Sequence, residues 1–209
     1  PGRVFAAVET IYRSLAETGE LDHFEFFLLS DTTDPDRWIA EELAWDTSRR
    51  RLGASGRLFY RRRFDNTGRK AGNLAEFCRR WGGRYACMIV LDADSVMSGE
   101  TLVSLARLMQ ANPHAGIMQT IPRLANRNTP FARAHQFASA CYGPVLARGL
   151  AWWYLGAGNY WGHNAIIRVR AFADHAGMPM LRGGPPFGGH ILSHDFVEAA
   201  LMRRAGWRV

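Results

Sequence analysis

Asp92 and Asp94, separated by one alanine, are the side chains of this sequence best suited to chemistry. They follow residues 85–91, a continuous apolar run that predicts a strand buried on both faces. If the strand geometry continues, both carboxylates project to the same side, because side chains alternate along a strand. Such a pair suits Mg²⁺ or Mn²⁺ held together with substrate phosphates. The simpler alternative is two loop aspartates that accept backbone hydrogen bonds.

The same residues also allow a phosphatase. Residues 91–96 resemble the motif of haloacid-dehalogenase-type phosphatases, in which Asp92 would be the nucleophile and Asp94 the acid/base. Those enzymes carry the motif near their start and a later acidic pair for the metal. No closely spaced acidic pair follows a downstream predicted strand here, so the phosphatase is the weaker interpretation.

Lys70 is the only lysine of the chain and stands near Gly72 at a predicted helix start. A helix amino end favours anions through its free N–H groups and its dipole, and lysine supplies a compact point charge. A diphosphate or nucleotide therefore suits this position, although a solvated turn explains the same residues. The sequence has neither a P-loop nor a GxGxxG pattern.

Asp195 opens the last predicted helix behind Ser193 and His194. Either Ser193 or Asp195 suits an N-cap, and acidic residues in a first turn are favoured by the helix dipole. The alternative is that Asp195 is a general base facing the carboxylates of Asp92 and Asp94. His190 and His194 have a spacing seen in metal-binding helices, but no third ligand follows, so no zinc site is expected.

Hydrophobic periodicity indicates strands alternating with helices, and so an α/β domain with a largely parallel sheet covered on both sides. In such sheets ligands bind beyond the carboxyl ends of strands, where Asp31 and Asp92 both fall. A capping-box spacing places one helix start at Asn73, with Glu76 as its partner. We expect strands at 24–29, 58–60, 85–91, 115–120 and 164–169, and helices at 3–17, from Pro35, 73–81, from Ser98, 130–143 and 195–204.

Length and composition describe one globular domain of 209 residues with a net charge of +7, a balance that suits nucleic acid, an anionic membrane face or a phosphorylated substrate. The three cysteines lack a CxxC spacing and are expected to be buried free thiols. No run of 18 apolar residues is present. Core packing is the usual reason for aromatic residues, but Tyr142 and the aromatic segment 152–161 lack a clear period, so a sugar-stacking platform or a membrane-interface contact is equally open.

Six motifs occur in the order found in the processive inverting glycosyltransferases of family 2, the group of cellulose and hyaluronan synthases, which the sequence resembles over nearly its whole length. They are Ser30-Asp31, Lys70-Ala71-Gly72-Asn73-Leu74, Leu91-Asp92-Ala93-Asp94, Gln119-Thr120-Ile121-Pro122, residues 162–168 and Ser193-His194-Asp195. Residues 161–168 and 192–207 narrow the resemblance to members that build osmoregulated periplasmic glucans.

The resemblance implies a role for each site residue. Asp31 would meet the uracil or ribose and Lys70 the nucleotide, while Asp94, with Asp92 assisting, would bind a divalent metal, Mg²⁺ or Mn²⁺, and the diphosphate. Asp195 would deprotonate the acceptor hydroxyl. The implied donor is UDP-glucose and the implied acceptor a growing β-1,2-glucan, with inversion at the anomeric carbon. A non-catalytic nucleotide-sugar-binding regulator on the same fold remains an alternative.

The resemblance also implies a GT-A type nucleotide-diphospho-sugar transferase fold with a mostly parallel central sheet flanked by helices. Residues 1–209 would be a single catalytic segment of a larger protein of the inner membrane, lying on the cytoplasmic side. The first strand with its nucleotide-contacting loop would precede Pro1, and the acceptor motif of the QxxRW type would follow Val209. Membrane contact would come through segments outside this chain, and no nucleic-acid partner is expected.

Overall fold

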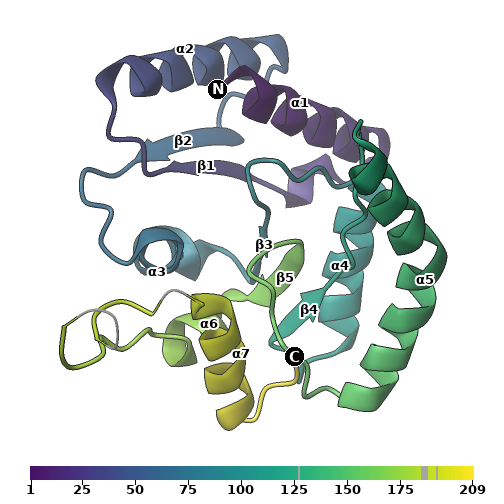
Figure 1. Cartoon of the computed structure of the whole chain (residues 1–209). Helices are drawn as coiled ribbons and strands as arrows, with labels where there is room; N and C mark the ends of the chain where they lie inside the picture. The colour runs from purple at the N-terminus through teal and green to yellow at the C-terminus, as the bar shows by residue number, and fades with distance from the viewer. Residues whose placement is uncertain (127, 185–187, 192) are drawn as a thin grey trace.

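Two small sheets form the framework of the structure, a computed structural model that describes residues 1–126, 128–184, 188–191 and 193–209 (Figure 1). In the first sheet, β1 (Phe26–Ser30) and β2 (Leu58–Arg62) run parallel, with Phe26 opposite Leu58. The second sheet has the order β3-β5-β4, made of β3 (Cys87–Val90), β5 (Ala165–Arg168) and β4 (Ile117–Gln119). The carboxyl ends of β1 and β3 lead directly into the predicted acidic motifs.

The α/β class is confirmed, but the sheet is more mixed than expected, because β5 is antiparallel to both of its neighbours. The cause is the path of the chain after β4. It returns to the end at which β4 stopped, where the Thr120 N–H donates to the Asn164 carbonyl over 2.9 Å. A strand that begins beside the end of its neighbour must run in the opposite direction, and β3 and β4 remain parallel to each other on either side of it.

Helices cover both sheets (Figure 1). Two of them have N-caps of the expected kind: the Asp34 side chain accepts from the N–H groups of Asp36 and Arg37, and the Ser98 hydroxyl accepts from that of Thr101. The helices are α1 (Gly2–Glu17), α2 (Pro35–Arg51), α3 (Arg69–Trp81), α4 (Gly99–Ala111), α5 (Pro130–Tyr154), α6 (Val169–His175) and α7 (His194–Arg204), with 3₁₀ turns at Leu21–His23 and Gly82–Arg84.

Figure 1 shows α1 and α2 on one side of the β1-β2 sheet and α3 on the other. The largest buried cluster joins α3, the strands of the second sheet, α6 and α7, with Ile167, Tyr160 and Met202 fully buried within it. A second cluster joins α1 to α4 around Leu15 and Met109. Among the residues that the structure describes, no helix combines the length and apolar composition that a membrane span requires.

Two predicted helix boundaries are wrong, and so is the prediction that all three cysteines are buried. Helix α3 begins at Arg69 rather than at Asn73, because the Asn73 side chain bonds to the strand β1 and its loop instead of capping a helix. Helix α5 continues through Pro144 to Tyr154. Of the three cysteines, Cys78 is buried as predicted, but Cys87 is only partly buried and Cys141 is exposed on α5. Leu192, which opens the motif 192–207, lies outside the described residues.

A cavity of about 1210 Å³ separates the two sheets and is lined by every residue of β1 and β3. These two strands belong to different sheets and are not hydrogen-bonded to each other. Helices α1, α3 and α4 supply the other walls, and the side chains of Lys70, Asn73 and Asp92 lie at its border. The cavity therefore lies alongside the predicted site and between two strand edges.

Candidate functional site

Lys70 and Asp92 form the first part of the site. Lys70 stands in the first turn of α3, one residue after Arg69, whose φ of 47° turns the chain sharply into the helix. Its Nζ makes an ion pair with Asp92 Oδ1. Both side chains remain partly exposed, at 34% and 40%. The structure thus brings together two residues that are 22 positions apart in the sequence and were predicted to serve one nucleotide site.

Asp94 differs from Asp92 in its surroundings. Strand β3 ends at Val90, and residues 91–94 leave it in a turn closed by the Ser95 N–H donating to the Asp92 carbonyl over 3.0 Å. The expected continuation of strand geometry through the pair is therefore wrong. Asp94 is exposed and makes no hydrogen bond or ion pair with another described residue. Among the described residues no cation pairs with its carboxylate, whereas that of Asp92 is paired with Lys70.

Asp31 lies in a tightly bonded cluster at the carboxyl end of β1. Arg63, whose side chain is 6% exposed, donates from Nε to Asp31 Oδ1 over 2.5 Å and from Nη2 to Oδ2 over 2.7 Å. Asn73 Nδ2 donates to Asp31 Oδ1 over 2.8 Å. Such a forked arginine–carboxylate pair is strong and fixes the direction of both groups. The cluster holds the end of β1, the end of β2 and helix α3 in one arrangement.

Gly72 is required by this cluster. A Cβ on Gly72 would lie 2.0 Å from the Thr67 carbonyl oxygen, which accepts a 3.0 Å hydrogen bond from Arg63 Nη1. We expect Gly72→Ala to lower the free energy of unfolding by about 1–3 kcal/mol, because the backbone must move to admit the methyl group. Thermal unfolding measures this loss. Gly83→Ala is the matched control, since nothing lies within 4 Å of a Cβ there; an equal loss in both variants would contradict the role of Gly72.

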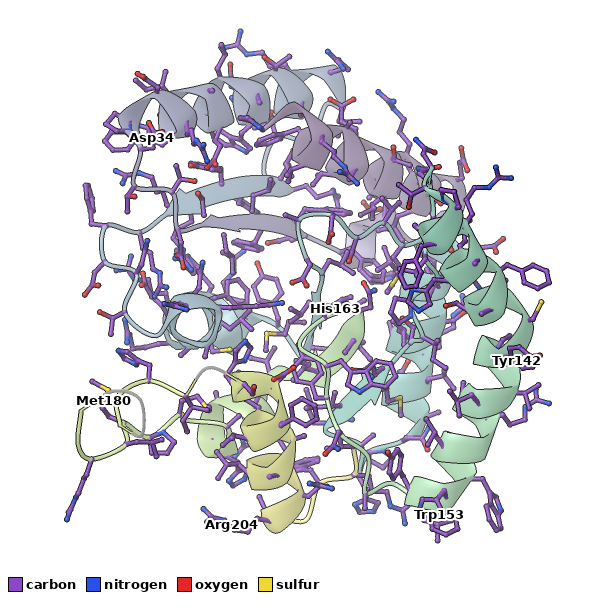
Figure 2. All side chains as sticks on the ribbon, in the orientation of Figure 1. Asp34, Tyr142, Trp153, His163, Met180 and Arg204 are labelled. Carbon is purple, nitrogen blue, oxygen red and sulfur yellow. The ribbon has the colours of Figure 1, made fainter. Side chains whose placement is uncertain are left out.

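Asp195 occupies the first turn of α7 and faces the loop before β5. A Cβ on Gly162 would lie 3.4 Å from Asp195 Oδ2, and Gly162 has a φ of 83°, which disfavours any other residue. The loop is fixed to β4, because the Trp161 N–H donates to Gln119 Oε1 over 2.7 Å. Ser193 stands at the N-cap position without a side-chain cap bond, so the simple capping interpretation of Ser193 is wrong. His163 of this loop lies near the centre of Figure 2.

Tyr160, Glu198 and His194 form a buried polar group beneath Asp195. Tyr160 and Glu198 are 0% and 1% exposed. Burial raises the pKa of the Tyr160 phenol, and the charges of Glu198, Asp92 and Asp195 raise it further. Burial also raises the pKa of Glu198. The charges of Glu198, Asp92 and Asp195 therefore all act on the buried phenol of Tyr160.

His194 connects this group to the start of α7. Its Nδ1 lies 3.1 Å from Glu198 Oε1, an ion-pair distance at an angle outside hydrogen-bond geometry. The contact with Glu198 raises the pKa of His194 against the lowering effect of burial, and the charge of Asp195 raises it further. Lys70 lowers the same pKa, so its charge is also close by. The charges of Asp195 and Lys70 thus both act on the imidazole of His194.

We expect Glu198→Ala to lower the free energy of unfolding by on the order of 3 kcal/mol, because it leaves His194 beside an empty volume without its partner. Glu198→Gln is the matched variant, since the amide keeps the volume and still has an oxygen for His194; its loss should be clearly smaller. Chemical denaturation of both variants provides the measurement. Equal stability of Glu198→Ala and the unaltered protein would show that the pair contributes nothing.

The structure pairs Lys70 with Asp92, places Asp195 beside Gly162, and holds Asp31 in a separate cluster with Arg63. Sequence reasoning missed four residues: Arg63, Tyr160, Glu198 and the pairing role of His194. The arginine run 61–63 at a strand end and the i, i+4 spacing of His194 and Glu198 were the available signals. Tyr160 belonged to an aromatic segment for which core packing and a surface role were both open, and its burial fits core packing.

Comparison with known proteins decides the family. The sequence profile of glycosyl transferase family 2 matches residues 5–176. The chain belongs to glycosyl transferase family 2. The α/β framework is thereby confirmed as that of a family 2 chain with a GT-A type fold, and the haloacid-dehalogenase interpretation of the Asp92-Ala93-Asp94 motif is set aside.

The family 2 chain is also similar to curated relatives named glucans biosynthesis glucosyltransferase H. It is 58% identical to the protein of Xanthomonas oryzae pv. oryzae over 207 residues, 99% of this chain and 32% of that protein. It is 56% identical to the protein of Xylella fastidiosa, again over 99% of this chain and 32% of that protein. It is 58% identical to that of Vibrio cholerae over 209 residues, 100% of this chain and 29% of the relative. The chain spans about a third of the length of these relatives.

Proposed function

We propose that this family 2 chain is the catalytic segment of a glucosyltransferase that moves glucose from UDP-glucose to a growing β-1,2-glucan. The observation that carries the proposal is the ion pair of Lys70 with Asp92 beyond the end of β3, together with the charges of Asp92 and Asp195 that both act on buried Tyr160. A cation and an acidic pair suit a metal-bound diphosphate, and a carboxylate a short distance away suits a base. The names of the relatives support glucose as the sugar and a glucan as the product.

The donor half of the proposed site consists of Lys70, Asp92 and Asp94, with Asp31 behind them. Two carboxylates beyond a strand end fit Mg²⁺ or Mn²⁺, which take one or two carboxylates together with substrate phosphates. Asp94 would hold the ion, because no described residue pairs with its carboxylate, and Lys70 keeps Asp92 directed toward it. The bound ion would stabilise negative charge on the leaving diphosphate. Asp31, directed by Arg63 and Asn73, would meet the uracil or ribose through lone pairs that these donors leave.

The acceptor half depends on Asp195. Its carboxylate removes the proton from the acceptor hydroxyl, whose oxygen forms a bond to the anomeric carbon from the side opposite the diphosphate. The bond between that carbon and the diphosphate oxygen breaks with its electron pair remaining on UDP, so the anomeric configuration inverts. Gly162 lets the loop backbone approach Asp195, and Glu198 with His194 fixes the first turn of α7 from below.

The cavity between the two sheets supports the proposal that residues 1–209 are one segment of a longer protein. Buried strand edges require backbone partners, and here β1 and β3 line an apolar space in which each has one edge without a strand from the described part of the chain. We propose that a strand from outside residues 1–209 pairs with both and joins the sheets into one. Its carboxyl end would then lie near Asp31 and Asp92, where a nucleotide-contacting loop is expected.

UDP-glucose is a cytoplasmic metabolite, so the proposal places the site on the cytoplasmic side of an inner membrane, with membrane spans contributed by other segments.

The deciding experiment is titration of UDP into the full-length protein with and without Mn²⁺, followed by measurement of UDP-glucose turnover. Metal-dependent binding with transfer of glucose supports the enzyme. Binding without any turnover would favour the non-catalytic regulator, and phosphate release from small phosphomonoesters would favour a phosphatase.

A further inference from the structure

Helix α5 exposes an unusual number of large apolar side chains. Phe131, Tyr142, Trp152 and Trp153 are 83%, 73%, 73% and 74% exposed. None of the helix's 25 residues is buried. Figure 1 shows α5 along the outer flank beside α4, and Figure 2 shows Tyr142 and Trp153 on the side of α5 that faces away from the body. Large exposed apolar patches on a protein mark sites of interaction.

The apolar residues form one continuous face. Tyr142, Val145 and Leu146 are three and four residues apart, and Trp152 and Trp153 follow Val145 and Leu146 after seven, the spacings of one helix side. The half-buried side that faces the body is made mostly of small residues: Ala132, Gln136, Ser139, Gly143, Ala147 and Leu150. The usual pattern of a surface helix, with its large apolar residues toward the core, is therefore reversed here.

The part of the chain that contains α5 carries only positive side-chain charges. Residues 101–173 contain seven arginines and no Asp or Glu, so this stretch carries the whole net charge of +7. On α5 itself Arg133 and Arg148 are both exposed, and Arg148, three residues after Val145, borders the apolar face. An apolar helix face with aromatic residues, on a helix whose charged residues are exposed arginines and include no Asp or Glu, matches an anionic lipid surface in both chemistry and charge.

We propose that α5 lies flat on an anionic membrane surface, with the face of Phe131, Tyr142, Val145, Leu146, Trp152 and Trp153 inserted among the headgroups. A tryptophan pair suits the boundary between headgroups and acyl chains, where its rings are apolar and its N–H groups are wet. The proposal concerns this chain's own surface and does not depend on the proposed transfer reaction. It adds a direct contact to the membrane association expected through segments outside the chain.

Charge favours a lipid surface over another protein segment as the occupant. A protein segment that covered α5 would have to present acidic groups to Arg133 and Arg148 or leave both arginines in water. Helix α5 has no acidic residue with which a basic group of such a segment could pair. A bilayer with anionic headgroups supplies that charge along the whole helix. Leu155, the residue that follows the helix, is also exposed, at 80%.

Cys141 offers a native position for the test, because it is exposed on α5 and lies eleven residues, or three helical turns, before Trp152 on the same side. The full-length protein is labelled there with an environment-sensitive fluorophore, after replacement of its other cysteines by alanine. It is then studied with vesicles of phosphatidylcholine containing phosphatidylglycerol. Nitroxide-labelled lipid quenches a label at the bilayer surface, and iodide quenches a label in water.

The proposal expects quenching of the Cys141 label by the nitroxide lipid and protection from iodide. Protection from both quenchers would mean that another protein segment covers α5, and quenching by iodide alone would mean that α5 stays in water; either result overturns the proposal. The matched control is a label at Leu43→Cys in a Cys141→Ala background, since Leu43 is 68% exposed on α2, a helix with acidic residues. That label should respond to iodide only.

A double variant, Arg133→Gln with Arg148→Gln, tests the charge argument. We expect the ratio of docked to undocked α5 to fall about fivefold for each arginine removed, and to fall similarly when phosphatidylglycerol is left out. Retention of lipid quenching in Trp152→Asp with Trp153→Asp would overturn the proposal, because charged groups do not insert among acyl chains. Circular dichroism and UDP binding of the same variants report whether the fold survives the change.

Discussion

Asp195→Asn is expected to reduce glucose transfer by about 10²- to 10⁴-fold while UDP binding stays within a factor of about two. Asparagine has the size of aspartate but does not accept a proton at neutral pH. The side chain lies against Gly162 and stands above the buried His194–Glu198 pair, so the isosteric change leaves these contacts in place. Initial rates with UDP-glucose, together with calorimetric titration of UDP, measure the two quantities on the same preparation of full-length protein.

This variant separates the two interpretations of Asp195. If the residue served only the helix dipole in the first turn of α7, asparagine would replace it at little cost, because asparagine is favourable at helix starts. Ser193→Ala is the matched control: Ser193 occupies the N-cap position but makes no side-chain cap bond, so activity should change little. A loss of UDP affinity as large as the loss of rate would refute the assignment of Asp195 as the base.

The sequence predicted the strand ends of the site better than its helix starts. The apolar run 85–91 and the motif after it led directly to Asp92, because a strand buried on both faces has few other patterns. Asn73 was misplaced for a physical reason. Its spacing to Glu76 is that of a capping box, but its amide is used across 42 positions to hold Asp31, and local spacing contains no information about such a partner.

Helix α5 is a second element whose extent the local sequence pattern did not predict. Gly143 and Pro144 are residues that normally end helices, so the expected helix stopped at 143 and the aromatic residues beyond it seemed to lack a period. The helix continues because Pro144 stands on its exposed side, where water can satisfy the carbonyl of Ala140. Once residues 145–154 are helical, their aromatic side chains acquire the period that the sequence alone did not reveal.

The direction of β5 and the buried group around Tyr160 were beyond the sequence for a related reason. The strand pattern of 164–169 is apolar in either direction, and only the return of the chain to Thr120 makes it antiparallel. Tyr160 and Glu198 are 38 positions apart and meet because α7 packs over the loop before β5. Polar residues that are buried by tertiary packing cannot be distinguished from surface residues by their types.

Asp94→Ala is expected to abolish the part of UDP affinity that depends on Mn²⁺, while the weaker binding measured in the presence of a chelator stays the same. Partners that only support a metal ligand already contribute about 10- to 100-fold to metal affinity, so loss of the ligand itself should cost at least about 100-fold. Asp92 cannot replace it fully, because Lys70 Nζ occupies one of its oxygens. Titration of UDP at a series of Mn²⁺ concentrations gives both affinities.

Two variants make this result specific. Asp174→Ala removes a carboxylate that pairs with Arg170 on the exposed side of α6, and it should leave metal-dependent binding unchanged. Lys70→Gln should weaken binding with and without Mn²⁺ alike, because it removes a cation near the diphosphate and at the same time releases Asp92. Unchanged Mn²⁺ dependence in Asp94→Ala would mean that Asp94 is a solvated turn residue, and the proposed metal site would then have to be built on Asp92 alone.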